Sequence, residues 1–467
     1  MLTPGDNDLL CRVEGAAPMG GMMRRHWLPA CMAEEVAEEP RAHGLTVGLG
    51  GLLHHAHRQP MPPHDAAHRR GAFHATQQIV IGGRQHGILS LLSISAYMKK
   101  LRLGIAGLGR AFAVSAPAFR DPRIQVVAAA DPREEARTRF ADEYRGRAYA
   151  TVEGLCADRE VDVVYVATPH EFHAQHTRFA ASAGKHVLCE KPMALTLEDC
   201  RSMIDAAQQA GVRLVVGHSH SFDLPIARTA ELAKAYGPVR MITALDYTDW
   251  VYRPRRPEEP AAALQNQASH QVSIARRLAG ARVRTVRGYT ASLDPARAAQ
   301  AAWSCQLGFD NGVFASLVYS GFAHFDSDEL MGWIGEMGQK KDPAAYWTSR
   351  MALHGDELTL KNARNYGGER FSSPQPAAHQ HFGFFLVSCE KADLRPMPHG
   401  VMIYAHAERR LEPLPAPAIP RAEVIDELYG AVVEGREPLH SGEWAMATVE
   451  VCLALLRSSR EGREVVL

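Results

Sequence analysis

The sequence predicts an α/β protein whose folded part begins with a doubly wound parallel sheet. Three observations predict it: a short apolar run ends in closely spaced glycines at 101–109, further apolar runs follow at intervals, and helix-like segments separate them. The later runs lie at 124–131, 161–170, 186–190 and 212–217. Strands that alternate with helices in this way form parallel sheets, and ligands bind at the carboxyl ends of those strands.

The first apolar run and its glycine turn, residues 99–110, organise the chain that follows. Gly107 would make the tight turn, and Gly109 would let backbone approach a phosphate at the amino end of the alanine-rich segment 111–119. This order of strand, turn and helix predicts a site for the pyrophosphate of a dinucleotide. The third position of the glycine pattern, usually glycine or alanine, is Phe112. The predicted contacts of the turn are completed by Arg110, Ala111 and Phe112.

The second apolar run ends in Asp131, about twenty residues beyond the glycines, where a carboxylate meets the ribose hydroxyls of a dinucleotide. Asp131-Pro132 also has the composition of a cap for a helix over 133–144. The two roles are compatible, and the glycine spacing favours the ribose role. A carboxylate there repels a ribose phosphate, which favours NAD over NADP. NADP stays an alternative cofactor because Arg133 lies nearby.

Polar residues cluster where the next strands end. The run 161–170 closes on Thr168-Pro169, the helical stretch 171–183 contains His173, and the run from 186 closes on Glu190-Lys191-Pro192. Thr196-Leu-Glu-Asp199 predicts a capping box for a helix through Ala210. We expect the cofactor to contact Thr168, Pro169, His173, Glu190 and Lys191.

The ordered series Gly107-x-Gly109, Ala167-Thr-Pro169 and Glu190-Lys-Pro192 resembles the Gfo/Idh/MocA family of NAD(P)-dependent oxidoreductases, over roughly 98–467. The resemblance implies a Rossmann domain over 98–220 and an α/β domain with a large open, mostly antiparallel sheet over 221–467. It also implies that Lys191 lies beside the nicotinamide of NAD, near a substrate hydroxyl. We expect a homo-oligomer that pairs through the open sheet.

Composition narrows the class of protein. The 52 Lys and Arg balance the 52 Asp and Glu, so there is no electrostatic case for nucleic acid or a membrane surface. The eight cysteines are scattered without paired metal spacing, which predicts reduced thiols and no metal site. No apolar run has the length of a membrane span, and the start lacks the order of a signal peptide. We therefore expect a cytoplasmic enzyme.

Residues 1–97 do not match the fold predicted for the rest. Residues 1–38 are similar to the start of Rieske-type oxygenase subunits of the phthalate 4,5-dioxygenase kind, but the Cys-x-His pairs of a Rieske cluster are absent. The stretch 39–97 is rich in His, Gly and Pro without a period, which predicts disorder rather than a histidine metal cluster. A truncated oxygenase remnant joined to the next reading frame, or a misassigned start codon before Met98, would explain it.

After Gly217 the chain changes character. The histidines of His218-Ser-His-Ser-Phe222 could line the site or cap surface turns, and 239–247 alternates as a strand. The loop 250–256 then places arginines beside aromatic rings, which fits a solvated basic loop or a substrate site equally well. The predicted substrate contacts in this loop are Tyr252, Arg253, Arg255 and Arg256.

A second candidate for catalysis precedes a predicted helix over 271–278. Asn266 and His270 are four residues apart, hence on one face if the segment is helical. The resembling enzymes often carry Asp-x-x-x-His here, with the histidine as proton acceptor. Asn266 can orient a hydroxyl but cannot stabilise an imidazolium by charge. The sequence therefore leaves open whether His270 or Lys191 is the base.

The remaining sequence predicts sheet. Segments 301–309 and 312–319 alternate around the turn Asp310-Asn-Gly312, a hairpin pattern, and a closing helix over 443–460 has one apolar face. These segments and the Asn266–His270 region resemble the branch of phthalate 4,5-cis-dihydrodiol dehydrogenases. That resemblance implies oxidation of a ring cis-diol to a catechol, with arginines binding the carboxylates. Oxidation of a sugar, an inositol or another carboxylated ring alcohol, and a non-catalytic NAD-binding sensor, are the alternatives.

Overall fold

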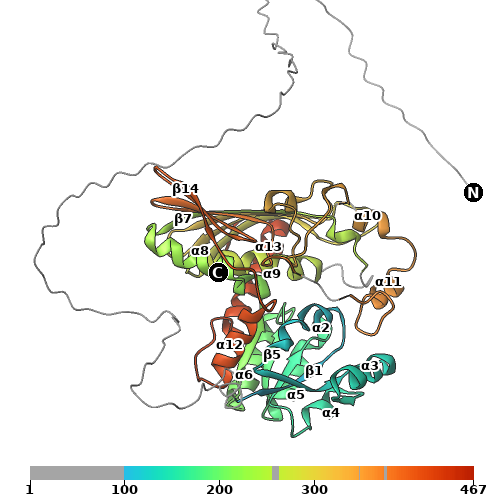
Figure 1. The fold of residues 1–467 in the computed structure, drawn as a ribbon. Coiled ribbons are helices and arrows are strands. Elements are labelled where there is room, and N and C mark those ends of the chain that lie inside the picture. Colours follow the sequence, from blue (N-terminus) through green and yellow to red (C-terminus); the bar gives the residue numbers. More distant parts are fainter. Residues whose placement is uncertain (1–98, 255–261, 346–347, 373–375) are drawn as a thin grey trace, which may run out of the picture. The chain divides into compact units, whose positions relative to one another are not determined.

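The computed structural model describes residues 99–254, 262–345, 348–372 and 376–467, all within the compact unit 86–467 (Figure 1). The predictions made for residues 1–97, and for Arg255 and Arg256, lie outside the described residues. No helix in the described part of the chain is long and apolar enough to cross a bilayer.

The first domain is the predicted doubly wound sheet. Six parallel strands stand in the order β3-β2-β1-β4-β5-β6, so the strand order reverses at β1, as in a Rossmann fold. The strands are β1 (Leu101–Ala106), β2 (Ile124–Ala130), β3 (Arg147–Tyr149), β4 (Val163–Val166), β5 (His186–Glu190) and β6 (Leu214–Gly217). The short edge strand β3 was not predicted, because three residues carry too little alternation to register.

Helices cover both faces of this sheet. Two of them differ from the prediction in where they end or begin. The alanine-rich helix ends at Ser115, because Pro117 cannot continue it, and a 3-10 turn follows. The next helix begins at Glu134, with Arg133 rather than Asp131 as its N-cap. Thr196 caps as predicted, because its Oγ1 accepts from the Asp199 N–H at 3.1 Å. The helices are α2 (Arg110–Ser115), α3 (Glu134–Tyr144), α4 (Val152–Cys156), α5 (His173–Ser182) and α6 (Leu197–Gln209).

The second domain is built on nine strands in the order β14-β13-β12-β11-β7-β10-β9-β8-β15, in which the pair β10–β7 is parallel and the others are antiparallel. The predicted hairpin is present as β9 and β10, and Gly312 at its turn has a φ of 84°. Helices α8 (Leu224–Ala235), α9 (Ala262–Ala279) and α13 (Gly442–Glu461) pack on one face (Figure 1). The strands are β7 (Val239–Tyr247), β8 (Val283–Ala291), β9 (Ala302–Phe309), β10 (Phe314–Ser320), β11 (Phe384–Cys389), β12 (Ala392–Met397), β13 (Gly400–Ala405), β14 (Arg409–Pro413) and β15 (Val465–Val466).

Helix α9 begins nine residues earlier than the predicted start at Gln271. The polar residues Gln265, Gln267 and Ser269 of its first half are all buried. Buried polar side chains hide the apolar period from which a helix is predicted. The earlier start places both Asn266 and His270 inside the helix, one turn apart.

The last two helices join the two domains. From α12 (Ala422–Val432), Val424, Ile425 and Leu428 pack into the apolar core beneath α2 and α3 of the first domain. Just before α13, the His440 carbonyl accepts from the Val216 N–H of β6 at 2.9 Å. Part of the range predicted as the second domain thus completes the core of the first.

Candidate functional site

A cavity of about 390 Å³ lies at the carboxyl ends of β1, β4 and β5 and is closed by residues of the second domain. Most of the predicted site residues line it: Gly109, Arg110, Ala111, Thr168, Pro169, His173, Glu190, Lys191, Arg253, Asn266 and His270. Residues that were not predicted also line it, among them Ser219, His220, Glu336, Lys361, Arg364, Asn365 and Arg421. The predicted residues Gly107, Phe112, Asp131, Arg133 and Tyr252 do not line it.

The glycine turn has the geometry that a phosphate site needs. Gly107 has a φ of 97°, and a side chain there would put its Cβ 2.9 Å from the Ala167 carbonyl oxygen. At Gly109, by contrast, an added Cβ would meet no atom within 4 Å. The backbone at Gly109 therefore faces open cavity, and the residues present fit a pyrophosphate.

Asp131 and Arg133 contact each other below this turn. The buried Asp131 carboxylate accepts from the Leu108 N–H at 2.8 Å and pairs with Arg133 Nε at 3.0 Å. Arg133 Nη2 donates to the Leu108 carbonyl at 2.7 Å. The pair holds the glycine turn in place, and its contact with a ribose stays a prediction.

His173 joins two of the strand-end turns. Its ring is buried, with Nε2 2.9 Å from the Thr168 carbonyl oxygen and Nδ1 2.9 Å from the Pro192 carbonyl oxygen. Glu190 is held from below, since its Oε1 accepts from the Tyr165 hydroxyl at 2.5 Å. These contacts fix the backbone on either side of Lys191.

Lys191 and Asn266 meet although they lie 75 residues apart. Lys191 Nζ donates to Asn266 Oδ1 at 2.6 Å. The pKa of Lys191 is lowered to about 8, mainly by burial; Glu190 and Glu336 oppose this shift, and Arg421 adds to it. At pH 7 roughly a tenth of this amine is therefore neutral, and near pH 8 about half of it is.

His270 is a buried, neutral imidazole. Burial lowers its pKa well below the ordinary value, and the positive charges of Lys191 and His220 add to the effect. Its Nδ1 has no hydrogen-bond partner among the described residues, and its ring lies 4.6 Å from that of His220. A neutral imidazole can accept a hydrogen bond from a hydroxyl, but one with so low a pKa is a weak proton acceptor.

His220 forms a chain of ionic contacts that sequence analysis left undecided between site and surface. The histidine is buried in α7 (Ser219–Phe222), so the surface alternative is wrong. Its Nδ1 lies 3.1 Å from Asp223 and its Nε2 lies 3.4 Å from Glu336. Burial lowers the pKa of His220, but these two carboxylates outweigh burial and raise it. Glu336 in turn pairs with Arg253 at 3.6 Å.

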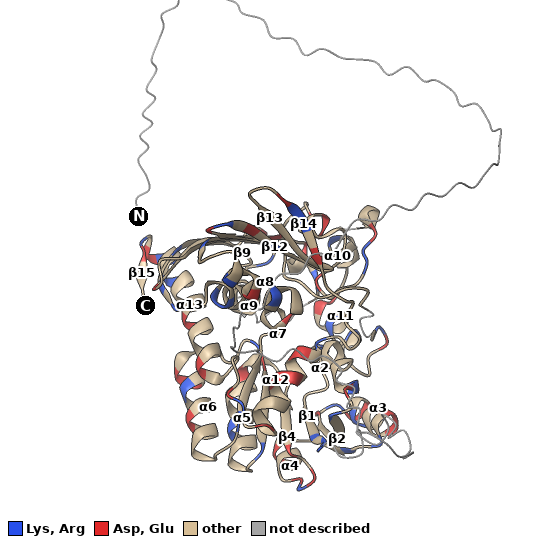
Figure 2. Cartoon of the chain, turned by 60° about the vertical axis from the view of Figure 1, so that its left-hand side comes forward, with Lys and Arg blue, Asp and Glu red and all other residues tan. Residues whose placement is uncertain are grey.

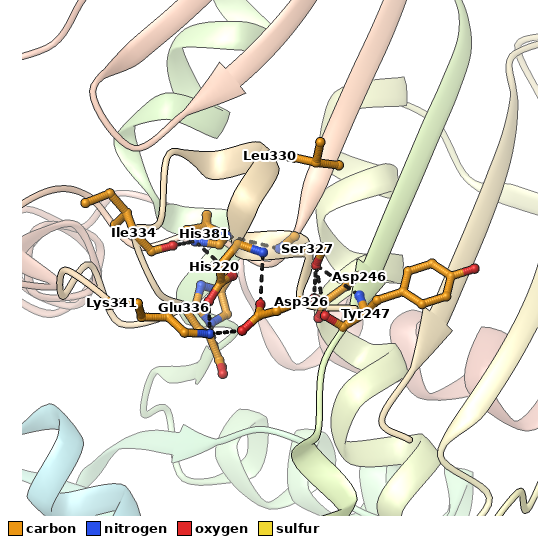
Figure 3. A network of polar contacts seen from close by, with 12 residues as sticks. His220, Asp246, Tyr247, Asp326, Ser327, Leu330, Ile334, Glu336, Lys341 and His381 are labelled. Carbon is orange, nitrogen blue, oxygen red and sulfur yellow. Dashed lines mark hydrogen bonds and ion pairs between the residues drawn. The ribbon is translucent and has the colours of Figure 1, made fainter. Parts of the chain in front are cut away.

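The loop that carries Glu336 is anchored by a polar network (Figure 3). His381 Nε2 contacts the Ile334 carbonyl oxygen at 2.7 Å, and the His381 N–H donates to the Glu336 carbonyl. Lys341 in the same network binds both Asp326 and Asp328. The network holds a carboxylate at the cavity from the second domain.

The cavity wall is predominantly basic. The guanidinium groups of Arg110, Arg253, Arg364 and Arg421 line it, whereas its acidic residues are Glu190 and Glu336. Burial, followed by the charges of Arg364 and Arg253, lowers the pKa of Arg110 to about 10. Repulsion among partly buried cations is relieved when an anion enters, so the cavity suits anionic ligands.

His220, His270 and Glu336 also have ligand atoms within 4.8 Å of one another, a spacing that could hold a metal ion. The charges around them oppose a divalent cation, because Arg253 pairs with Glu336 and Lys191 lies beside His270. We therefore interpret His220 and Glu336 as members of an ionic chain with Asp223 and Arg253, and His270 as a neutral ring packed beside His220.

The sequence did not predict Glu336, Arg364 and Arg421 as residues of the site. Glu336 stands in the Gly-Glu-Met-Gly338 turn, where glycines mark a close approach, but a lone acid gives no sign of its partner. Arg421 follows a proline-rich stretch and has a left-handed φ of 60° at the start of α12. Tyr252, which was predicted, stacks under Arg350 and lines a neighbouring cavity.

Comparison with known proteins agrees with this arrangement. Residues 101–218 match the oxidoreductase family with an NAD-binding Rossmann fold, and residues 227–358 match the Gfo/Idh/MocA C-terminal domain. The chain belongs to the Gfo/Idh/MocA family. It is therefore an oxidoreductase with an NAD-binding Rossmann domain, as the sequence predicted.

Individual members of the Gfo/Idh/MocA family extend the comparison. A 1-carboxy-3-chloro-3,4-dihydroxycyclohexa-1,5-diene dehydrogenase of Comamonas testosteroni is 44% identical over 377 residues, which is 77% of this chain and 95% of the relative. A solved dehydrogenase structure from Bordetella bronchiseptica RB50 is 39% identical with a TM-score of 0.74, covering 79% of this chain and 100% of the other. The WlbA dehydrogenase of Bordetella pertussis, solved with NADH, shares the fold at 22% identity and a TM-score of 0.56, over 79% of this chain and 99% of its own.

Proposed function

We propose that this oxidoreductase oxidises one hydroxyl of a cis-dihydrodiol on a carboxylated ring, with NAD as hydride acceptor. The observation that carries the proposal is that Lys191, which donates to Asn266 and has a pKa lowered to about 8, lines the same basic cavity as neutral His270. The Comamonas testosteroni relative, named for a carboxylated and dihydroxylated cyclohexadiene, supports the choice of diol.

In the proposed reaction Lys191 is the base. Its neutral amine takes the proton of one ring hydroxyl, and Asn266 Oδ1 orients the amine by accepting a hydrogen bond from it. Neutral His270 accepts a hydrogen bond from the adjacent hydroxyl and so holds the diol. Bound NAD supplies the acceptor for the hydride that leaves the same carbon. The C–H and O–H bonds break as the C=O bond forms, and the ketone tautomerises to an aromatic catechol.

The finer proposal is a phthalate 4,5-cis-dihydrodiol, which carries two carboxylates. Arg253 is the described member of the predicted arginine loop that reaches the cavity, and an arginine fork suits a carboxylate. Arg255 and Arg256 would serve the second carboxylate, a role predicted from sequence alone.

An inositol substrate is the second candidate. The inositol 2-dehydrogenase 2 of Saccharopolyspora erythraea is 30% identical over 244 residues, which is 69% of that relative. A neutral polyol would leave the basic wall without an anion, which makes this candidate the weaker one. A non-catalytic sensor would have no use for a lysine with a lowered pKa beside a hydride acceptor.

The test is NADH formation by the purified chain with the cis-dihydrodiols of phthalate and of benzoate, and with myo-inositol. We expect NADH and a catechol product from the carboxylated diols. Turnover of the inositol alone would overturn the proposal. Binding of NAD without turnover of any of these alcohols would favour the sensor.

We also propose a homo-oligomer through the open sheet of the second domain. Its support is two large exposed aromatic side chains of that sheet, Tyr289 of β8 (62% exposed) and Phe314 of β10 (51% exposed), whose strands are separated by β9. Light scattering of the wild type and of Phe314→Glu would test it, since an added charge should shift the mass to that of the monomer.

A further inference from the structure

A segment of the second domain, residues 357–372, lies against the cofactor side of the first domain; we call it the cover segment. It begins with α11 (Glu357–Ala363), which Figures 1 and 2 both draw beside α2. The Ser372 carbonyl accepts from Arg110 Nη1 at 3.2 Å, and the Tyr366 carbonyl accepts from Arg133 Nη1 at 3.3 Å. The cover segment thus contacts the arginines on both sides of the glycine turn.

Tyr366 anchors the cover segment. Its ring is 1% exposed and meets the Phe112 ring edge-on, with centroids 5.1 Å apart, and its hydroxyl donates to Glu143 at 2.6 Å. Phe112 is the residue that departs from the glycine pattern at its third position. The departure has a structural purpose, because an alanine there would remove the first-domain ring on which Tyr366 packs.

Beyond the anchor, the cover segment supplies one wall of the main cavity. Lys361, Arg364 and Asn365 line the same space as Gly109 and Arg110. In the described part of the chain, the Arg364 guanidinium has no hydrogen bond or ion pair. Burial and the charge of Arg253 lower its pKa, so the folded chain holds Arg364 as a partly buried cation without a counter-charge. A group of this kind is favourable only when an anion joins it.

We propose that the cover segment is part of the dinucleotide site. Arg364 and Lys361 bind the pyrophosphate from the side opposite the glycine turn, and the contact of Tyr366 with Phe112 holds them there. A pyrophosphate fits better than a substrate carboxylate, because the cover segment contacts Arg133 and residues of α2 and α3, which flank the glycine turn. The inference rests on the NAD-binding domain and is independent of which alcohol is oxidised.

The test measures the Kd of NADH for the full chain by fluorescence, without any alcohol present. We expect Arg364→Met to raise the Kd of NADH by about tenfold or more, because the variant loses a charge-assisted contact to a phosphate. Arg370→Met is the matched control, since Arg370 lies on the same segment but lines the neighbouring cavity. It should leave the Kd within about twofold.

Two further probes make the result specific. ADP-ribose, which keeps the pyrophosphate, should lose as much affinity as NADH in Arg364→Met, whereas adenosine, which lacks it, should lose none. The effects of Tyr366→Ala and Arg364→Met should be less than additive, because both remove the same contact. Arg364→Met is confined to the cavity wall, so it tests the proposal even if Tyr366→Ala fails to fold.

An unchanged Kd for NADH and ADP-ribose in Arg364→Met would overturn the inference. If that variant instead raised only the KM of a carboxylated diol, Arg364 would belong to the substrate. Loss of NADH affinity in a chain that oxidises none of the proposed diols would refute the proposed function and leave the cover segment in place.

Discussion

The two walls of the cavity are built in different ways. The first-domain wall consists of short motifs, each at the end of a strand, such as the glycine turn and Glu190-Lys191-Pro192. The second-domain wall gathers single residues from separate segments, among them Glu336, Arg364 and Arg421. A parallel sheet brings all its strand ends to one edge, so its chemistry can be placed locally. The opposite wall depends on tertiary packing and can change its charges without disturbing that sheet.

If the first-domain wall carries the proposed base, Lys191→Met should have the largest effect on turnover. The variant keeps the volume of the side chain but removes the proton acceptor. We expect kcat to fall by about a hundredfold or more while the Kd of NADH stays nearly unchanged. In His270→Asn kcat should fall less, because this variant would lose only a hydrogen bond to the diol. Equal loss of NADH affinity and of kcat in Lys191→Met would mean that the lysine binds rather than reacts.

Arg253→Met tests whether the second-domain wall binds the carboxylate of the substrate. Removing one charge-assisted contact should cost about 2 kcal/mol, or roughly thirtyfold in the KM of a carboxylated cis-diol. A cis-diol without carboxylates is the control and should show little change. If both substrates suffered equally, the effect would come from the lost pair with Glu336, and the arginine would be structural.

The pH dependence of kcat/KM links the two walls. With Lys191 as base, kcat/KM should fall about tenfold per pH unit below the lysine pKa of about 8 and level off above it. Arg421 lowers that pKa from the second wall, so Arg421→Met should raise it and move the midpoint to higher pH. A rate that declined above pH 8 would instead assign Lys191 to stabilising the alkoxide as a cation.

The smallest expected effect concerns residues outside both walls. The first strand of the described part begins at Leu101, and the sequence predicts that residues 1–97 belong to no part of the fold that follows. A shortened protein that begins at Met98 should therefore keep the kcat, the NADH affinity and the Tm of the full chain. Loss of folding in the shortened protein would show that the leading residues contribute to the enzyme.

How much the sequence predicted follows the same division. All strands of the first domain except the short β3, the Thr196 cap and the β9–β10 hairpin were predicted, because their patterns are local. Lys191 and His270 were found through motifs, although the contact of Lys191 with Asn266 spans 75 residues. Arg364 and Arg421 could not be found, because nothing near an isolated arginine tells which distant groups it will face. Phe112 was noticed as a departure, but its reason lay in Tyr366, in the other domain.

The way α12 completes the first domain has a consequence for synthesis of the chain. Val424, Ile425 and Leu428, which fill the core beneath α2 and α3, are synthesised roughly 200 residues after β6. At about 5–20 residues per second, this is a delay of roughly 10–40 s. During that interval the six-stranded sheet leaves the ribosome with an apolar surface open to water. The nascent first domain is therefore the stage at which this protein should most need a chaperone, and a chain stalled before Ala422 should aggregate.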